Sequence, residues 1–275
     1  MGLKKMLKIL KMIPLYIIVF TASASILEQY DLRSYSQGLA AYGLKNISFE
    51  MRIEGLEKRL LEKSNLGKIT DVYFFIEWKV PNEIKVEVRG LPKGFFQLKN
   101  SLILQTRPIL LQIFKPKLTQ VYRSFEIKEV NKGKKIHVKA RDLTSKKLSL
   151  ERELIFSIDG KLEYTAMATP SMSVETTYKM DRISWSHNKW VLFEVNSKST
   201  SGGKQHFRMV DFQYKQLKSG FGFPRKIIIK EEDRAAIYSP KEKKLVETSF
   251  NKVTSVILFS NYIVNKRRGK KEDHQ

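Results

Sequence analysis

The chain has 275 residues, a formal net charge of +23 and no cysteine. The lack of cysteine excludes disulfides, cysteine-ligated zinc, iron–sulfur clusters and thiol catalysis. Hydrophobic residues make up 42% of the chain, which is enough for a real core and excludes disorder as the main state. So large a positive charge points to nucleic acid or to an anionic membrane surface as a partner.

Residues 1–24 have the pattern of a secretory signal peptide. Four lysines precede or flank the apolar run Met12–Phe20, and Ala22-Ser23-Ala24 matches a cleavage site. The alternative is an uncleaved anchor, although the uncharged stretch is short for a membrane span. We expect cleavage and a periplasmic protein. Anionic envelope surfaces, and not nucleic acid, are then the expected partners of the basic chain.

A helix is predicted over Leu27–Tyr42, because Tyr35, Leu39 and Tyr42 recur at helical spacing and Gly43 is a typical stop. After Gly43 the hydrophobic period is two, which indicates strands with one buried face. The predicted strands are Ile47–Ile53, Val72–Val80, Ile84–Arg89, Val121–Val130, Lys135–Arg141, Leu150–Ile158, Lys161–Ala168, Val174–Arg182, Lys189–Asn196, His206–Gln216, Arg225–Glu231 and Leu245–Phe259.

The predicted fold class is mainly β (α+β). Many short strands without an alternation of strands and helices indicate a single curved antiparallel sheet that forms an open half-barrel. Three prolines interrupt the segment Leu91–Leu118, which is therefore predicted to be a helix or a loop pair. We expect one domain over residues 25–265, a disordered basic tail over residues 266–275, and a monomer.

No residue pattern points to catalysis or to a metal site. The four histidines do not pair at metal-ligand spacing, and no nucleophile motif is present. The acidic run Glu231-Glu232-Asp233 is interpreted as a solvated turn at a strand end. We therefore expect a protein that is not an enzyme and that needs neither a cofactor nor a metal.

One predicted strand is basic on one side. Lys135, Lys139 and Arg141 alternate with Val138 and Ala140, so the cations are expected on the outer face. This face is a candidate for binding an anionic membrane surface. The alternative is a solvated face that keeps the protein soluble.

The second feature is the amount of large apolar side chains, together with the apolar run Leu102–Phe114. A curved, open sheet has a concave face that must be covered or filled. A helix laid across that face would leave an apolar cavity for a ligand with acyl chains. The alternative is that Leu102–Phe114 simply closes the core.

Three parts of the chain resemble the outer-membrane lipoprotein carrier and sorting family (LolA/LolB-like). The first is a signal and helix followed by the strand Ile47–Ile53. The second is Gly67, then Val72–Trp78, the turn Lys79-Val80-Pro81-Asn82 and the return strand Ile84–Arg89. The third is Tyr214 followed by Gly220-Phe221-Gly222-Phe223-Pro224-Arg225-Lys226-Ile227.

The resemblance implies an unclosed antiparallel barrel with an N-terminal helix and a lid of short helices over an apolar cavity. It also implies a role in lipoprotein sorting. The arginine of the family's turn falls on Val80, so the resemblance carries over the fold and a lipophilic ligand but not the family's release cycle.

The leading hypothesis is a non-enzymatic periplasmic protein that binds a lipid or an acylated, lipoprotein-like ligand inside the half-barrel. The rival is an envelope interaction module with a solid core that binds a protein or an anionic glycan. The candidate cavity residues are Phe74, Ile76, Trp78, Val86 and Phe114.

Overall fold

We describe the protein from a computed structural model. The described residues are 24–63, 69, 71–81, 83–144, 151–239 and 244–265. The predicted signal peptide, except Ala24, and the predicted tail over 266–275 lie outside these residues. So do Gly67 and Asn82, which contribute to the family resemblance.

Within the described residues, one sheet of twelve strands has the order β3-β2-β1-β12-β11-β10-β9-β8-β7-β6-β5-β4, and all neighbouring strands are antiparallel. Strands β3 and β4 are the two free edges, so the sheet is curved but unclosed. The strands are β1 (Asn46–Ile53), β2 (Tyr73–Lys79), β3 (Glu83–Arg89), β4 (Phe125–Lys132), β5 (Lys135–Asp142), β6 (Glu151–Ser157), β7 (Leu162–Ala168), β8 (Met172–Asp181), β9 (Val191–Ser201), β10 (Lys204–Gln216), β11 (Gly222–Ser239) and β12 (Lys244–Val264).

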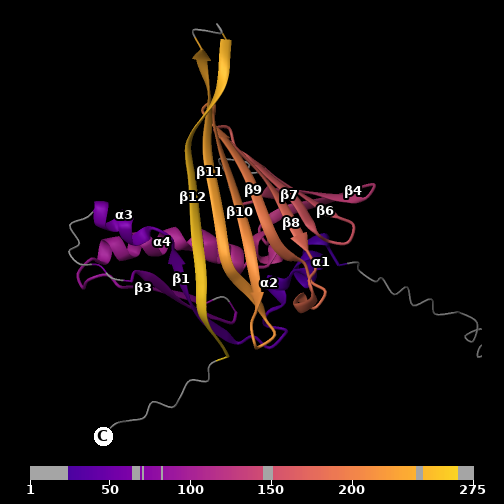
Figure 1. Cartoon of the computed structure of the whole chain (residues 1–275). Coiled ribbons are helices and arrows are strands. Elements are labelled where there is room, and N and C mark those ends of the chain that lie inside the picture. The colour runs from indigo at the N-terminus through magenta and orange to yellow at the C-terminus, as the bar shows by residue number, and fades with distance from the viewer. Residues whose placement is uncertain are drawn as a thin grey trace, which may run out of the picture.

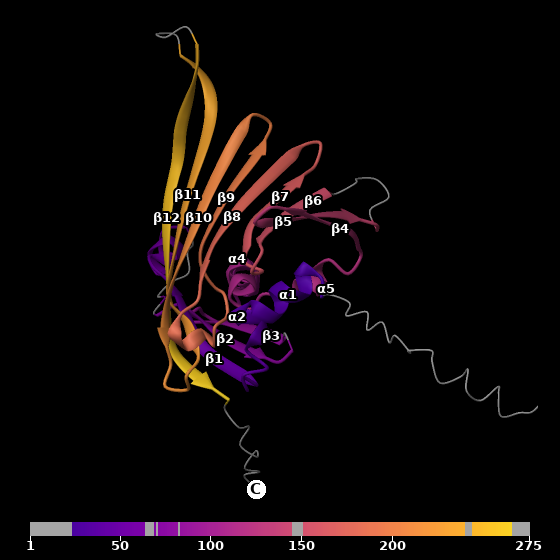
Figure 2. The same cartoon turned by 90° about the vertical axis from the view of Figure 1, so that its right-hand side faces the viewer.

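Most of the helices lie on the concave side of this sheet, as Figures 1 and 2 show. The long helix α4 runs inside the curve, and α1, α2 and α5 lie at its open side. The helices are α1 (Ile26–Arg33), α2 (Tyr35–Gly38), α3 (Leu56–Lys63), α4 (Phe96–Ile113) and α5 (Leu118–Val121), with a short 3-10 turn at Ser184–Ser186. The half-barrel predicted from the alternating pattern is therefore confirmed.

The N-terminal helix is interrupted where one helix was predicted over Leu27–Tyr42. Ser34 is extended and lies beside Trp190, and the Trp190 N–H donates to the Arg33 carbonyl at 2.7 Å. The Tyr35 N–H donates in turn to the Trp190 carbonyl at 2.9 Å. This tertiary pairing takes up the Arg33 carbonyl and the Tyr35 N–H on either side of Ser34 and divides the segment into α1 and α2.

Other differences from the predicted elements have local causes. Most of Leu91–Leu118 forms the helix α4, with Pro108 inside it. The predicted strand Val121–Val130 begins only at Phe125, because the one-turn helix α5 occupies Leu118–Val121. Helix α3 was not predicted. Strand β11 continues eight residues past its predicted end at Glu231.

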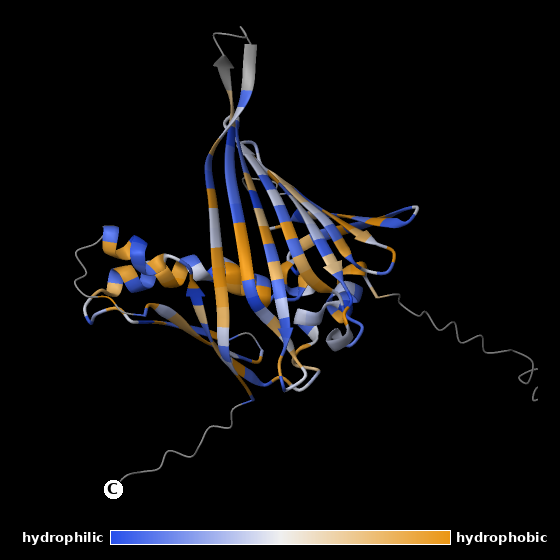
Figure 3. Ribbon diagram, viewed as in Figure 1, coloured by the Kyte–Doolittle hydropathy of each residue, from blue (hydrophilic) through white to orange (hydrophobic). Residues whose placement is uncertain are grey.

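The core lies between the concave face and the helices. Apolar side chains on the inward face of β1, β2, β5, β6 and β10 are buried in one hydrophobic cluster with residues of α4. Figure 3 shows hydrophobic residues alternating along the strands and concentrated on α4. The most enclosed large side chains are Tyr30, Phe49, Phe74, Phe156, Phe212 and Phe223.

The upper parts of β10, β11 and β12 project beyond the helices (Figure 1). No described side chain in the β11 stretch 231–236 or the β12 stretch 247–256 is buried. Among the described residues, no helix has the length and hydropathy needed to cross a bilayer.

Candidate functional site

The five residues predicted to line a cavity lie in the layer between β2, β3 and the end of α4. Phe74 and Ile76 are completely buried, and Val86 is half-buried at the edge of the cluster. Trp78 stacks on Phe114 with ring centroids 5.0 Å apart and planes 7° from parallel. The Phe114 ring also lies against Phe49 and Phe223. These side chains pack against one another, and their role in ligand binding stays a prediction.

A hollow of about 350 Å³ lies elsewhere on the concave face, over β6, β7 and β8. Its size is at the lower end of the range of small-molecule sites, which is about 300–1,000 Å³. It is open to solvent on one side and lined mainly by apolar and aromatic side chains. The lining residues are Tyr30, Gln37, Lys115, Pro116, Leu118, Val121, Tyr122, Arg152, Leu154, Leu162, Thr165, Ala166, Met167, Val174, Thr176 and Tyr178.

A buried carboxylate fixes the helical side of this hollow. Asp31 on α1 accepts hydrogen bonds from the Leu118 N–H at 2.7 Å and the Thr119 N–H at 3.0 Å. The Thr119 hydroxyl donates a third at 2.7 Å. These bonds satisfy backbone donors at the start of α5, which would otherwise lack partners. They hold α5, and the Lys115–Leu118 segment before it, against α1.

Lys115 brings a positive charge into the hollow. It follows the end of α4, is half-buried, and lies with its Nζ 5.2 Å from the centre of the Tyr178 ring. Desolvation by the surrounding atoms lowers the pKa of Lys115 from 10.5 to about 8. Among the described residues, no carboxylate lies within ion-pair distance of this ammonium group. Burial of an unpaired cation is costly, which marks the group as a candidate for ligand contact.

Arg152 brings a second charge from the opposite wall. Its guanidinium carbon lies 5.7 Å from the centre of the Tyr122 ring and 5.4 Å from that of Phe125. Its buried Nε has no hydrogen-bond acceptor in the described part of the chain. The register explains this, because Arg152 on β6 lies between Ala140 on β5 and Met167 on β7. Its cross-strand neighbours offer no carboxylate.

Tyrosine hydroxyls complete the polar part of the hollow. The hydroxyls of Tyr178 and Thr165 form a hydrogen bond of 3.1 Å. Burial raises the pKa of Tyr178, and burial likewise raises that of Tyr30. Both phenols are therefore neutral at pH 7 and can donate or accept a hydrogen bond. The site combines two cations and neutral hydroxyls with an otherwise apolar surface.

Neither cation of this site was predicted from the sequence. Arg152 alternates with Leu154 and Phe156, which are buried on the same face of β6. An arginine at an inward position of a strand was a usable signal. Lys115 had no such signal, because it is brought to the hollow by the path of the chain between α4 and α5.

The predicted basic strand is β5, and its alternation is confirmed. Val138 and Ala140 are buried, whereas Lys135, Lys139 and Arg141 are exposed. Acidic residues accompany these cations. Lys135 Nζ lies 3.2 Å from Glu163, Lys139 is opposite Glu153, and Arg141 is between Glu126 and Glu151. The outer face is therefore of mixed charge, and binding of an anionic surface there stays a prediction.

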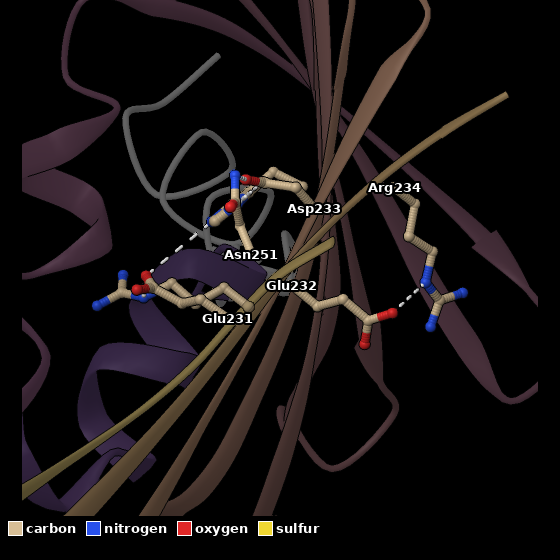
Figure 4. Close-up of polar contacts among 7 residues, drawn as sticks. Glu231, Glu232, Asp233, Arg234 and Asn251 are labelled. Carbon is tan, nitrogen blue, oxygen red and sulfur yellow. Dashed lines mark hydrogen bonds and ion pairs between the residues drawn. The ribbon is translucent and has the colours of Figure 1, made fainter. Parts of the chain in front are cut away.

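The acidic run Glu231-Glu232-Asp233 was wrongly interpreted as a solvated turn, because it lies in the middle of β11. Asp233 lies 2.8 Å from the Nδ1 of His206 on β10 and accepts from the Nδ2 of Asn251 on β12. Arg208 forms an ion pair of 3.1 Å with Glu231. Figure 4 shows Glu232 and Arg234 on the opposite side from Glu231 and Asp233. Charge pairing between strands replaces hydrophobic alternation here.

These contacts lower the pKa values of two carboxyl groups in the acidic run. A hydrogen bond from Arg234 is the main cause that lowers the pKa of Glu232 to about 2, helped by Ser249. The hydrogen bond with His206, followed by that from Asn251, lowers the pKa of Asp233. Among the described residues, no cluster of histidine and carboxylate side chains has metal-binding geometry. The contacts of Glu231 and Asp233 with His206, Arg208 and Asn251 join β11 to its two neighbouring strands.

Comparisons with models of protein families and with curated proteins returned no match. Among solved structures, the chain is similar to the crystal structure of MucB in complex with MucA(peri). The identity is 7% and the TM-score 0.18, over 86% of this chain and 92% of that chain. A similarity at this TM-score carries no conclusion about function. Membership in the lipoprotein carrier and sorting family therefore stays a prediction.

Proposed function

We propose that this protein is a non-enzymatic binding protein of the periplasm that takes a lipid or another ligand with an acyl chain into its half-barrel. The observation that supports the proposal is the hollow of about 350 Å³ on the concave face, which is bounded by three strands and by the α1–α5 contact. Its location differs from the predicted cavity, whose residues pack around Phe114.

The energetics of such binding are favourable. Burying an acyl chain contributes about 0.8 kcal/mol per methylene, so six to eight buried methylenes give about 5–6 kcal/mol. Useful affinity therefore needs few polar contacts. The half-barrel supplies the required apolar wall through Leu154 and Leu162, which are buried, and through Met167 and Val174, which remain partly accessible.

A fluorescent fatty acid provides the test. Titration of the purified protein with 11-(dansylamino)undecanoic acid should give saturable binding with a blue-shifted emission. Met167→Asp places a carboxylate in the hollow and should weaken that binding by at least tenfold. The matched control is Met172→Asp, since Met172 lies outside the hollow at the start of β8 and is 37% exposed.

Solvent extraction of the freshly purified protein, followed by mass spectrometry, provides an independent readout. Co-purifying acyl lipids should be present in the parent protein and in Met172→Asp, and depleted in Met167→Asp. Absence of both extracted lipid and probe uptake from the parent protein would contradict the proposal. The rival reading of an interaction module would then remain.

A further inference from the structure

We infer that the ligand of the hollow is a single-chain amphiphile with an anionic headgroup, a carboxylate or a phosphate, which is held by Lys115 and Arg152. This inference rests on the proposed function and adds the chemistry of the ligand. Both residues line the same hollow, from the helical side and from the sheet side respectively.

Neither of these two cations has an ion-pair partner among the described residues, although both lie in a largely apolar hollow. Three other arginines of the sheet each have a carboxylate partner: Arg89 with Glu87, Arg208 with Glu231, and Arg234 with Glu232. The outward neighbours of Arg152 on β6, Glu151 and Glu153, are turned to the other face, where they lie opposite Arg141 and Lys139. The protein thus has carboxylates within one residue of Arg152 but directs them away from the hollow.

The aromatic rings position the cations without neutralising them. Lys115 lies over Tyr178, and Arg152 lies over Tyr122 and Phe125. A cation–π contact contributes about 0.5–2 kcal/mol, which does not replace the hydrogen bonds of a buried charge. The unsatisfied Nε of Arg152 still requires an acceptor. A carboxylate or phosphate oxygen supplies one, and the planar guanidinium suits both groups.

The rest of the hollow selects for a chain and not for a free anion. Apolar and aromatic residues form most of its lining, so a small hydrated ion would leave that surface without a partner. The volume of about 350 Å³ is small for such sites and favours one chain. Charge complementarity at one part of the hollow and apolar contact in the rest together specify the amphiphile.

The experiment compares ligands that share a chain and differ in the headgroup. Decyl phosphate, decanoate, decanol and inorganic phosphate would be titrated into the protein by calorimetry at pH 7, below the concentrations at which the amphiphiles aggregate. Decyl phosphate and decanoate should bind at least tenfold more tightly than decanol, and inorganic phosphate should show no measurable binding.

Substitution of the cations separates headgroup recognition from folding. Lys115→Met and Arg152→Met should each weaken binding of the anionic amphiphiles by about tenfold to a hundredfold, the size of one hydrogen bond to a charged group. Decanol binding should be unchanged in both variants, which also shows that the hollow is intact. Lys139→Met is the matched control, because this exposed cation on β5 lies outside the hollow and should leave every affinity unchanged.

The binding results separate the headgroup inference from the proposed function. Equal binding of decanol and the anionic amphiphiles by the parent protein overturns the headgroup inference, whereas the proposed function stands. Binding of inorganic phosphate as tight as that of decyl phosphate overturns the need for a chain. Absence of binding by all four compounds overturns both the inference and the proposed function.

Discussion

We expect burial of Lys115 to lower the stability of the ligand-free protein at neutral pH. Its pKa is about 8 in the folded protein, because burial penalises the ammonium form, against 10.5 for an ordinary lysine. Between about pH 8 and pH 10.5, Lys115 is therefore protonated in the unfolded chain and mostly deprotonated in the folded chain. The free energy of unfolding contributed by this group therefore rises with pH from about 8 to about 10.5. The other titratable groups that line the hollow are Tyr30, Tyr122, Tyr178 and Arg152.

Lys115→Met should consequently increase the free energy of unfolding at pH 7, although it weakens binding of an anionic ligand. Urea unfolding at pH 7, 8, 9 and 10 measures the effect as a difference from the parent protein. That difference should be largest at pH 7 and shrink toward pH 10. Lys139→Met should show no such trend. Destabilisation by Lys115→Met at pH 7 would indicate that the lysine serves packing instead of ligand binding.

At the scale of elements, α4 is the main support of the concave face. Phe114, which follows the last residue of the helix, stacks on Trp78 of β2. The Phe114 ring also lies against Phe49 and Phe223. Five of the helix residues are buried: Leu102, Thr106, Ile109, Leu110 and Ile113. The helix therefore fills the part of the half-barrel near β1 and β2, and the hollow remains near β6 to β8.

This packing predicts unequal effects of two truncations. Phe114→Ala should lower the free energy of unfolding by about 3–5 kcal/mol, because it leaves a cavity in a packed core. Met167→Ala, in the wall of the hollow, should cost less than about 1.5 kcal/mol, because its side chain already borders open space. Chemical denaturation of both variants provides the comparison. A cost below 1 kcal/mol for Phe114→Ala would argue that Phe114 instead lines an open cavity, as the sequence analysis proposed.

At the scale of the whole molecule, helices cover only part of the sheet. The segments of β10 to β12 beyond α4 contain the charged cluster of His206, Arg208, Glu231 and Asp233, and none of the described helices lies against them. Burial of apolar surface, which dominates stability, is confined to the part of the sheet beside the helices. The projecting strands therefore depend on hydrogen bonds and ion pairs that water can reach.

Native-state hydrogen exchange should separate these two regions. Amides of β11 from Ile227 to Ile229, which pair with both neighbours beside the core, should exchange only through global unfolding. Amides from Arg234 to Ala236 should exchange at least a hundredfold faster, through local opening of the projecting strands. Mass spectrometry of peptides from the two segments provides the measurement. Equal protection along β11 would show that the projection is part of the same cooperative unit.

The strands and their faces could be read from the sequence because alternation is a local property. A period of two places Val138 and Ala140 of β5 inward and Lys139 and Arg141 outward. The same period places Phe74, Ile76 and Trp78 on one face of β2. The helix pattern around Tyr35 was also visible. Its break at Ser34 was not, because it depends on Trp190, far along the chain.

The sequence by itself determined that this protein is a cysteine-free, basic chain of alternating strands with one apolar helical segment, and hence a curved sheet with a covered concave face. Only the tertiary structure decided where that face is packed and where it is hollow. The residues that line the hollow are spread along the chain from Tyr30 to Tyr178. Asp31 holds the helical wall of the hollow in place through its hydrogen bonds to α5. Contacts over such separations depend on strand order and register, which the local pattern of residues does not contain.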